Sequence, residues 1–324
     1  MPNMIHRRTV LSMLAALAAG QAIGQTSVGS TRPLTLVVAY PPGGPTDQLA
    51  RALAETITSG IGRTVIVDNK PGGGGQIAAA WVRQQPADSS VVLLGDVATL
   101  GSNVALYRKF AYDPLTDFQP VTQLMATANV LYVNRANPVG SLQDLVVHAK
   151  AKGLSFASQG AGSGGHLLGV LLKTQSGADL VHVPYRGSGP AMQDLLAGQV
   201  DLLFDGVGAG LPYVRDGRLK ALAVAASRRA PLLPDVPTTA EAGWPALRLE
   251  TWFGAVVKTG TPKESVLALN RDLVAALLGA EMQSRFASLG YELTPTTPEQ
   301  LAERMREDGR RWTELIRAQG ITVE

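Results

Sequence analysis

Apolar and polar residues alternate in blocks along this chain, so that short β-prone runs are separated by longer stretches of helical character. The runs that predict strands lie at 34–39, 65–67, 91–94, 154–157, 181–183, 202–204 and 219–225. Helical patterns lie between them at 48–58, 77–84, 166–174 and 190–196. From residue 262 onward the chain is mostly helical, at 262–278, 281–289 and 298–318. This order predicts an α/β fold with mostly parallel sheets flanked by helices.

The segment LVVAYPPGGPTDQLAR at 36–51 joins an apolar strand to a helix through a tight corner. The prolines at 41–42 cannot continue a central strand, and the glycines at 43–44 allow a ligand to approach the backbone closely. Thr46 or Asp47 can cap the helix that follows. The N-terminus of such a helix presents unpaired N–H groups and the positive end of its dipole. The corner therefore predicts a carboxylate or phosphate site, with an ordinary ligand-free turn as the alternative.

The same order of strand, glycine-rich corner and helix recurs at 154–174, where the sequence is LSFASQGAGSGGHLLGVLLKT. About 300 residues remain after the N-terminal signal described below, which is more than one small core usually holds. Two corners in such a chain predict two lobes. If the lobes face each other, the two helix N-termini converge on one cleft and could hold a ligand between them.

A third candidate segment, VPYRGSGPAMQDLLAGQVDLLFD at 183–205, adds side chains suited to an anion. Tyr185 and Arg186 end a strand, and Ser188 lies where the next helix begins, so a hydroxyl, a cation and a third set of helix N–H groups are close in sequence. A surface Arg186 with Ser188 as a simple helix cap is the alternative. Asp205 ends the following strand, where it either faces the cleft or starts a turn.

The first 24 residues have the pattern of an export signal. A basic stretch at 6–8 precedes an apolar run at 10–19, and small residues suit cleavage after Gly24; a short amphipathic helix is the alternative. No later segment offers the roughly 20 uninterrupted apolar residues of a membrane-spanning helix. We therefore expect a soluble mature protein in the periplasm. Arg7 and Arg8 also resemble a twin-arginine signal, so Sec and twin-arginine export both remain open.

Composition narrows the possible partners. The formal charge is +3, and it becomes +1 when Arg7 and Arg8 leave with the signal, so no basic surface predicts nucleic-acid binding. The chain has no cysteine, which excludes disulfides, a lipidated N-terminal cysteine and thiolate metal sites. Its histidines are scattered without metal-ligand spacing. We expect neither a metal nor a cofactor.

Two segments of the sequence also allow an enzymatic interpretation. The run GAGSGG at 160–165 matches a dinucleotide-binding pattern and predicts an exported NAD(P)-dependent oxidoreductase. No acidic residue ends the next strand to bind a ribose, although Arg186 could meet a 2′-phosphate. Ser163 and His166 could instead form a hydrolase nucleophile and base, but the chain has no GxSxG elbow. Ser163 as a helix cap and His166 as a structural or ligand-contacting residue is the simpler interpretation.

Taken together, the motifs resemble the Bug family, the TctC-like periplasmic solute-binding receptors of tripartite tricarboxylate transport systems. The resemblance covers essentially the whole mature chain. It rests on seven segments in family order: AYPPGGPTDQLAR at 39–51, VDNKPGGGGQIAA at 67–79, YDPLTDFQPV at 112–121, SQGAGSGGHL at 158–167, the segment at 183–205, LPDVPTTAEAG at 233–243 and WFGAVVKTGTP at 252–262.

The resemblance implies a two-lobed Venus-flytrap receptor without catalytic activity. Such a receptor is a monomer that closes on a small carboxylate (a dicarboxylate, an aromatic acid or an acidic amino acid) and delivers it to integral-membrane permease subunits. Lobe one would be discontinuous, at 32–122 plus 251–324, and lobe two would span 123–250. The crossover strands would lie near 130–133 and 250–257.

The resemblance also implies that main-chain amides, hydroxyl side chains and waters hold the ligand carboxylates. Carried over position by position, the expected ligand-binding residues are Tyr40, Gly43, Gly44, Thr46, Asp47, Asp96, Thr99, Ser158, Gly162, Ser163, His166, Tyr185, Arg186, Gly187, Ser188 and Asp205. Among these, Asp47 is better suited to a helix cap than to a ligand contact.

One position departs from the family pattern. After the third strand the family often has several small hydroxyl residues, whereas this chain has GDVAT at 95–99, which keeps Thr99 and introduces Asp96. A carboxylate beside an anion site is unfavourable unless a positive group partners it. We hypothesise that Asp96, if it faces the cleft, selects a ligand with an ammonium or another donor. Asp96 turned to solvent as a helix cap is the alternative.

Overall fold

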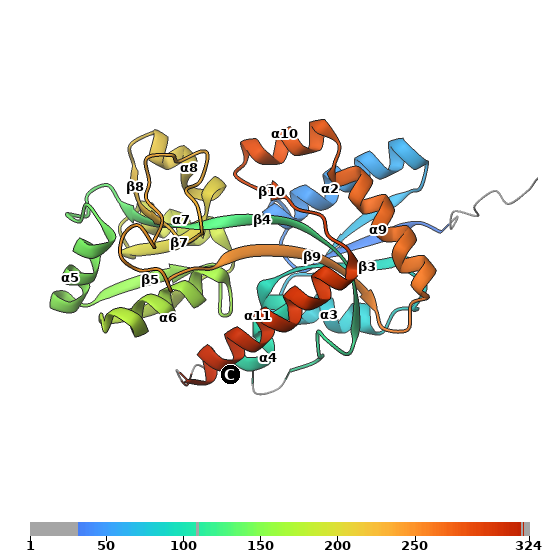
Figure 1. Cartoon of the computed structure of the whole chain (residues 1–324), viewed down its shortest axis with the longest axis horizontal. Coiled ribbons are helices and arrows are strands. Elements are labelled where there is room, and N and C mark those ends of the chain that lie inside the picture. The colour runs from blue at the N-terminus through green and yellow to red at the C-terminus, as the bar shows by residue number, and fades with distance from the viewer. Residues whose placement is uncertain (1–31, 108–109, 319, 321–324) are drawn as a thin grey trace, which may run out of the picture.

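The structure is a computed structural model that describes residues 32–107, 110–318 and 320. The predicted export signal at 1–24 lies outside these residues. Figure 1 shows two lobes side by side, each built on a sheet with helices packed against it. The predicted two-lobed α/β fold is therefore confirmed. Within the described part of the chain, no helix has both the length and the apolar character needed to cross a membrane.

Lobe one is built on the strands nearest the N-terminus. Parallel strands β1 (Leu34–Val38), β2 (Val65–Asn69) and β3 (Val91–Asp96) lie in the order β2-β1-β3, and β9 (Glu250–Lys258) pairs antiparallel with β3. β1 lies between its two neighbours and is almost wholly buried, as its apolar run predicts. The N-terminal helices and turns of this lobe are α2 (Pro45–Ile61), η1 (Gly73–Gly75), α3 (Gln76–Arg83), η2 (Ala98–Ser102) and α4 (Asn103–Leu106).

Lobe two repeats this arrangement with the central segments of the chain. β5 (Leu154–Ser158) pairs in parallel with β6 (Leu180–Pro184) and β7 (Leu202–Gly206), and β8 (Leu219–Val224) lies on the far side of β4. Its helices are α5 (Leu142–Lys152), α6 (Gly164–Ser176), α7 (Ser188–Leu196) and α8 (Val207–Arg215). Each of α6, α7 and α8 directly follows a strand, so their N-termini gather at one edge of the sheet.

A single long strand joins the two lobes. β4 (Phe118–Asn134) pairs with β9 through its first part and with β7 and β8 through its last part. Figure 1 shows β4 and β9 running together across the middle of the molecule. The lobe boundaries predicted at 122/123 and 250/251 fall inside β4 and at the first residues of β9, and they stay a prediction.

The C-terminal helices complete lobe one. α9 (Lys263–Leu277) and α10 (Ala280–Ser288) lead to the short strand β10 (Glu292–Leu293), which pairs with β4. α11 (Pro298–Ala318) packs on η2, α4 and β4 and buries Trp312 and Ile316. The indole of Trp252 on β9 donates to Asp308 of α11 at 2.5 Å. The C-terminal helix α11 therefore packs against the two long strands β4 and β9 and against the helical turns η2 and α4.

Candidate ligand-binding cleft

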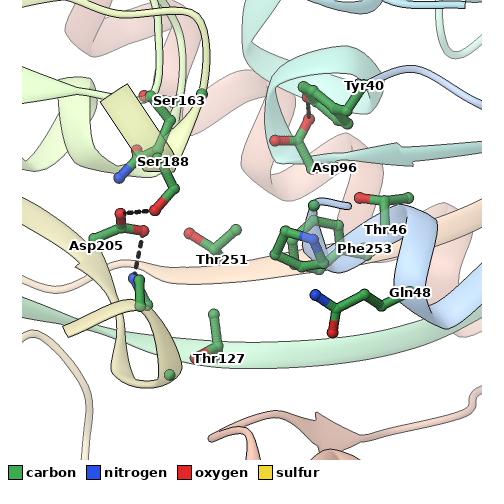
Figure 2. A pocket seen from close by; sticks show the side chains of 18 of the residues that line it. Tyr40, Thr46, Gln48, Asp96, Thr127, Ser163, Ser188, Asp205, Thr251 and Phe253 are labelled. Atoms are coloured by element: carbon green, nitrogen blue, oxygen red, sulfur yellow. Dashed lines mark hydrogen bonds between the residues drawn. The ribbon is translucent and has the colours of Figure 1, made fainter. Parts of the chain in front are cut away.

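A cavity of about 520 Å³ lies between the two lobes. Its volume suits a small organic molecule. Figure 2 shows side chains from the corner after β1, from β3 and from α2 on one wall, and from the corner before α6, from α7 and from β7 on the other, with β4 and β9 below. The predicted site residues that line it are Tyr40, Gly43, Gly44, Thr46, Asp96, Ser163, Arg186, Gly187, Ser188 and Asp205.

On the lobe-one wall, the corner after β1 delivers the N-terminus of α2 to the cavity. The helix begins earlier than the sequence pattern predicts, with Gly44 as N-cap and Pro45 in the first turn, where its missing N–H is no loss. Neither Thr46 nor Asp47 is the cap residue. The carboxylate of Asp47 instead accepts a 2.9 Å hydrogen bond from the Gly43 N–H, which holds the corner closed from inside.

Three helix N-termini face the cavity from lobe two. α6 begins after Ser163, whose hydroxyl accepts from the His166 N–H at 3.3 Å, so the predicted cap is confirmed. α7 begins after Gly187, with a φ of +107° that favours glycine. α8 begins after Gly206. All three corners contribute residues to the cavity wall, which therefore carries several helix N–H groups and the positive ends of three dipoles.

Asp96 lies on the lobe-one wall at the end of β3 and is 8% exposed. Its Oδ1 accepts from the Tyr40 hydroxyl at 2.5 Å and from the N–H groups of Ala98 and Thr99 at 3.1 Å each. Asp96 therefore accepts from the N–H groups of the helical turn that follows, as a cap residue does, and it also lines the cavity. The alternative that it turns to solvent is wrong, because the residue is buried. Burial raises its pKa, and the hydrogen bonds from Tyr40 and Thr99 oppose that rise.

Asp205 lies on the opposite wall at the end of β7 and is also buried. The Ser188 hydroxyl donates to its Oδ2, and the Gly206 N–H donates to its Oδ1 at 2.7 Å. Ser188 is the first residue of α7. Its hydroxyl donates to Asp205 and does not cap the helix. Burial raises the pKa of Asp205, and the Ser188 hydrogen bond opposes the rise. The pair ties the β7 and α7 corners together.

The remaining predicted residues do not line the cavity but support the loops that do. Asp47 is held by Arg51 at 3.0 Å and by Asn69 at 2.9 Å. Burial alone would raise its pKa, but the hydrogen bonds from Arg51 and Gly43 outweigh burial and lower it. Thr99 is fully buried behind Asp96. The other residues of this group are Ser158, Gly162, His166 and Tyr185, and the Tyr185 hydroxyl donates to Asp194 at 2.6 Å.

His166 belongs to a buried aromatic stack behind the α6 corner. Its Nδ1 accepts from the Gly162 N–H at 3.0 Å, and its ring stacks on His182 with centroids 4.0 Å apart. Burial lowers the pKa of His166 to about 4. The Ser163 hydroxyl donates to the Gly160 carbonyl at 2.7 Å, so it is not bonded to the His166 ring. Ser163 and His166 therefore stabilise the loop before α6. Their side chains do not have the geometry of a nucleophile hydrogen-bonded to its base.

Sequence reasoning missed the residues that the crossover strands and the C-terminal segment contribute. Thr127 and Asn129 come from β4, and Thr251 and Phe253 come from β9. Figure 2 places Thr127, Thr251 and Phe253 between the two walls. Further lining residues outside the prediction include Pro41, Pro42, Gln48, Gln159, Gly164, Gly208, Leu289 and Tyr291. Pro41, Pro42 and Gly164 lie within the glycine-rich corners, and Gln48 and Gln159 lie close to them in sequence. The segments of Leu289 and Tyr291 carry no such corner that would have marked them.

The chain is similar to a known family of receptors. It matches the family model described as tripartite tricarboxylate transporter family receptor, TctC, over residues 49–321. The chain belongs to this receptor family. The TctC resemblance drawn from the sequence motifs is thus confirmed.

Solved structures of TctC-like periplasmic binding proteins are similar to this chain in both fold and sequence. The structure titled "R. palustris Rpa4515 with adipate" is 34% identical with a TM-score of 0.85 and covers 91% of this chain and 100% of that one. MatC from Rhodopseudomonas palustris with bound malate is 34% identical with a TM-score of 0.81, covering 88% and 99%. The periplasmic binding protein BugD is 33% identical with a TM-score of 0.82, covering 90% and 99%. These TctC-like neighbours are solute-binding proteins, and two of them hold dicarboxylates.

Proposed function

We propose that this chain is a periplasmic receptor that captures a small carboxylate in the interlobe cleft and delivers it to permease subunits of a tripartite tricarboxylate transporter. The observation that carries the proposal is the meeting of four helix N-termini, from α2 on one lobe and α6, α7 and α8 on the other, at one cavity. Helix N-termini bind carboxylates through unpaired N–H groups and the positive end of the dipole. Family membership and the adipate-bound and malate-bound relatives support the same ligand class.

Capture works by closure of the two lobes about β4 and β9. The cavity wall is divided between the lobes, so a ligand makes its full set of contacts only when both walls approach it. Such a ligand shifts the population toward the closed form. No bond of the ligand is broken in this scheme, and the export signal at 1–24 would place the receptor where it meets extracellular solutes.

Native mass spectrometry of protein purified from the periplasm of an expression host tests the proposal. We expect a retained small acid that is released on denaturation, and isothermal titration calorimetry with that acid on stripped protein should show one site per chain. A retained dinucleotide, or hydrolysis of an ester by the purified protein, would overturn the receptor function in favour of an enzyme.

A further inference from the structure

The carboxylate of Asp96 has one oxygen that the protein leaves open. Its hydrogen bonds from Tyr40, Ala98 and Thr99 all reach Oδ1. No hydrogen bond from the described residues reaches Oδ2, although the residue is only 8% exposed. In Figure 2 this second oxygen points away from Tyr40 toward the lobe-two wall. A carboxylate oxygen that faces a cavity and has no donor from the described residues is free to accept a hydrogen bond from a ligand.

No cationic side chain of the described residues is paired with the Asp96 carboxylate. The charged residues among those lining the cavity are Asp96, Asp205 and Arg186, and Arg186 is an exposed residue of lobe two. No described lysine or arginine forms a salt bridge with Asp96. Closing the lobes removes more water from this carboxylate, which makes an unpartnered charge still less favourable.

Asp205 differs from Asp96 in the way that matters here. Both of its oxygens are used within the protein, by Ser188 and by Gly206. Through these bonds Asp205 joins the β7 and α7 corners of the lobe-two wall. Of these two carboxylates, Asp96 is therefore the one with an oxygen that is free to accept a hydrogen bond from a ligand.

We propose that Asp96 selects ligands that carry an ammonium group beside their carboxylate, with the ammonium donating to Asp96 Oδ2 and the carboxylate lying against the helix N-termini of lobe two. The inference rests on the proposed function and names its ligand class as amino acids and amino-carboxylates. A charge-assisted hydrogen bond to a buried carboxylate is strong and directional. A plain dicarboxylate would instead place a second negative charge near Asp96, with which no described lysine or arginine forms a salt bridge.

The rival arrangement is a protonated Asp96 that donates to a ligand carboxylate. The four donors on Oδ1, which are the Tyr40 and Thr99 hydroxyls and the N–H groups of Ala98 and Thr99, favour the ionised form because each stabilises negative charge. Burial acts in the opposite sense by raising the pKa of Asp96. The two arrangements differ in the ligands they favour, so a binding experiment separates them.

Calorimetry at about pH 7.5 with two matched pairs provides that experiment. Aspartate and malate differ by an ammonium in place of a hydroxyl, and 5-aminopentanoate and adipate differ by an ammonium in place of a carboxylate. We expect an amino member to bind more tightly than its partner in at least one pair. In Asp96→Asn, which keeps an acceptor for Tyr40, that member should lose about ten-fold or more in affinity, while its partner should lose none.

Two further variants guard the interpretation. Asp96→Ser, which places a small hydroxyl on the wall, repeats the test if Asp96→Asn does not fold by circular dichroism. Asp235→Asn removes an exposed carboxylate outside the cavity and should leave both members of each pair unchanged. Tighter binding of malate than aspartate together with tighter binding of adipate than 5-aminopentanoate by the unmodified protein would overturn the inference while leaving the carboxylate receptor standing. An unchanged preference in Asp96→Asn, or no binding by either amino member, would also overturn it.

Discussion

The Ser102 hydroxyl of lobe one donates to the Gly162 carbonyl of lobe two at 3.0 Å, and both residues lie behind the cavity wall. This bond crosses from η2 to the corner before α6, so it exists only while the two lobes are together. Asn103 and Leu106, which follow Ser102, lie so close to Gly162 that a Cβ there would collide with both. The two lobes therefore also meet at residues that do not line the cavity.

Ser102→Ala should weaken ligand binding without a change in the cavity wall. Loss of one interlobe hydrogen bond worth about 1 kcal/mol makes the closed form less favourable and lowers affinity about five-fold. Calorimetry with the retained ligand measures the effect. Ser59→Ala is the matched control, because Ser59 bonds only to carbonyls of its own helix. Equal affinities for Ser102→Ala and the unmodified protein would show that the bond persists when the lobes open.

Gly208→Ala should hold the lobes apart at the other side of the cleft. A Cβ at Gly208, in the first turn of α8, would overlap the Leu289 carbonyl at the end of α10. Because a backbone atom cannot swing aside as a side chain can, α8 and α10 must separate. We expect affinity to fall about ten-fold or more, with the secondary structure by circular dichroism retained. Gly60→Ala, where a Cβ meets nothing within 4 Å, should bind normally; a similar loss there would point to a general effect of the substitution.

Gly44→Leu should fold and yet fail to bind. Gly44 lines the cavity at the N-cap of α2 with φ −75°, and a Cβ there comes no closer than 3.7 Å to another atom, so the backbone tolerates a side chain. The added isobutyl group would occupy the space in which a ligand meets the first-turn N–H groups. We expect a thermal midpoint within a few degrees of the unmodified protein and no heat of binding by calorimetry. Normal binding by the folded variant would contradict the placement of the ligand at this corner.

The stacked rings of His166 and His182 predict a loss of stability in mild acid. Burial lowers the pKa of His166 to about 4, and burial together with the neighbouring His166 ring lowers that of His182 to about 3. Both lie below the value near 6.5 of an unfolded chain, so the unfolded state takes up protons first as pH falls. The free energy of unfolding then falls between about pH 6.5 and 4, by at most about 1.4 kcal/mol per pH unit for each ring.

The raised pKa values of Asp96 and Asp205 act in the opposite sense, because there the folded state takes up the proton first as pH falls. Thermal midpoints at about pH 7.5, 6 and 5 give the net slope. His182→Phe retains a ring in the stack and cannot be protonated, so its decline should be shallower. His148→Gln changes a histidine outside the stack and should follow the unmodified protein. An identical slope for His182→Phe would remove the stack as the cause.

Most strands and helices could be predicted because each depends on local pattern. The apolar runs at 34–39 and 202–204 became β1 and β7 within two residues, since strands buried on both faces need continuous apolar sequence. The start of α2 was misplaced because Pro45 reads as a turn residue but suits the first turn of a helix. The full length of β4 was missed, because a strand that contains Pro120 and serves two sheets has no single pattern.

In the candidate site, too, the local sequence predicted some features and not others. Glycine-rich corners mark the turns at 40–47, 158–166 and 185–189, because only glycine reaches the positive φ that Gly43, Gly162 and Gly187 adopt. Residue type did not reveal side-chain direction, so His166 and Thr99 were grouped with the cavity although they lie behind it. Thr127 and Thr251 carried no signal, because they reach the cavity only through the pairing of β4 with β9.

The sequence by itself determined the α/β class, the corners that present helix N-termini, and the membership in a receptor family, because these depend on residue order and backbone freedom over a few residues. The tertiary structure decided which side chains share the cavity, that Asp96 faces it with one oxygen open, that Ser102 bonds to Gly162 across the lobes, and that Gly208 lies too close to Leu289 for a side chain. Those relationships join residues far apart along the chain. They are set by strand register and lobe packing, which no local pattern encodes.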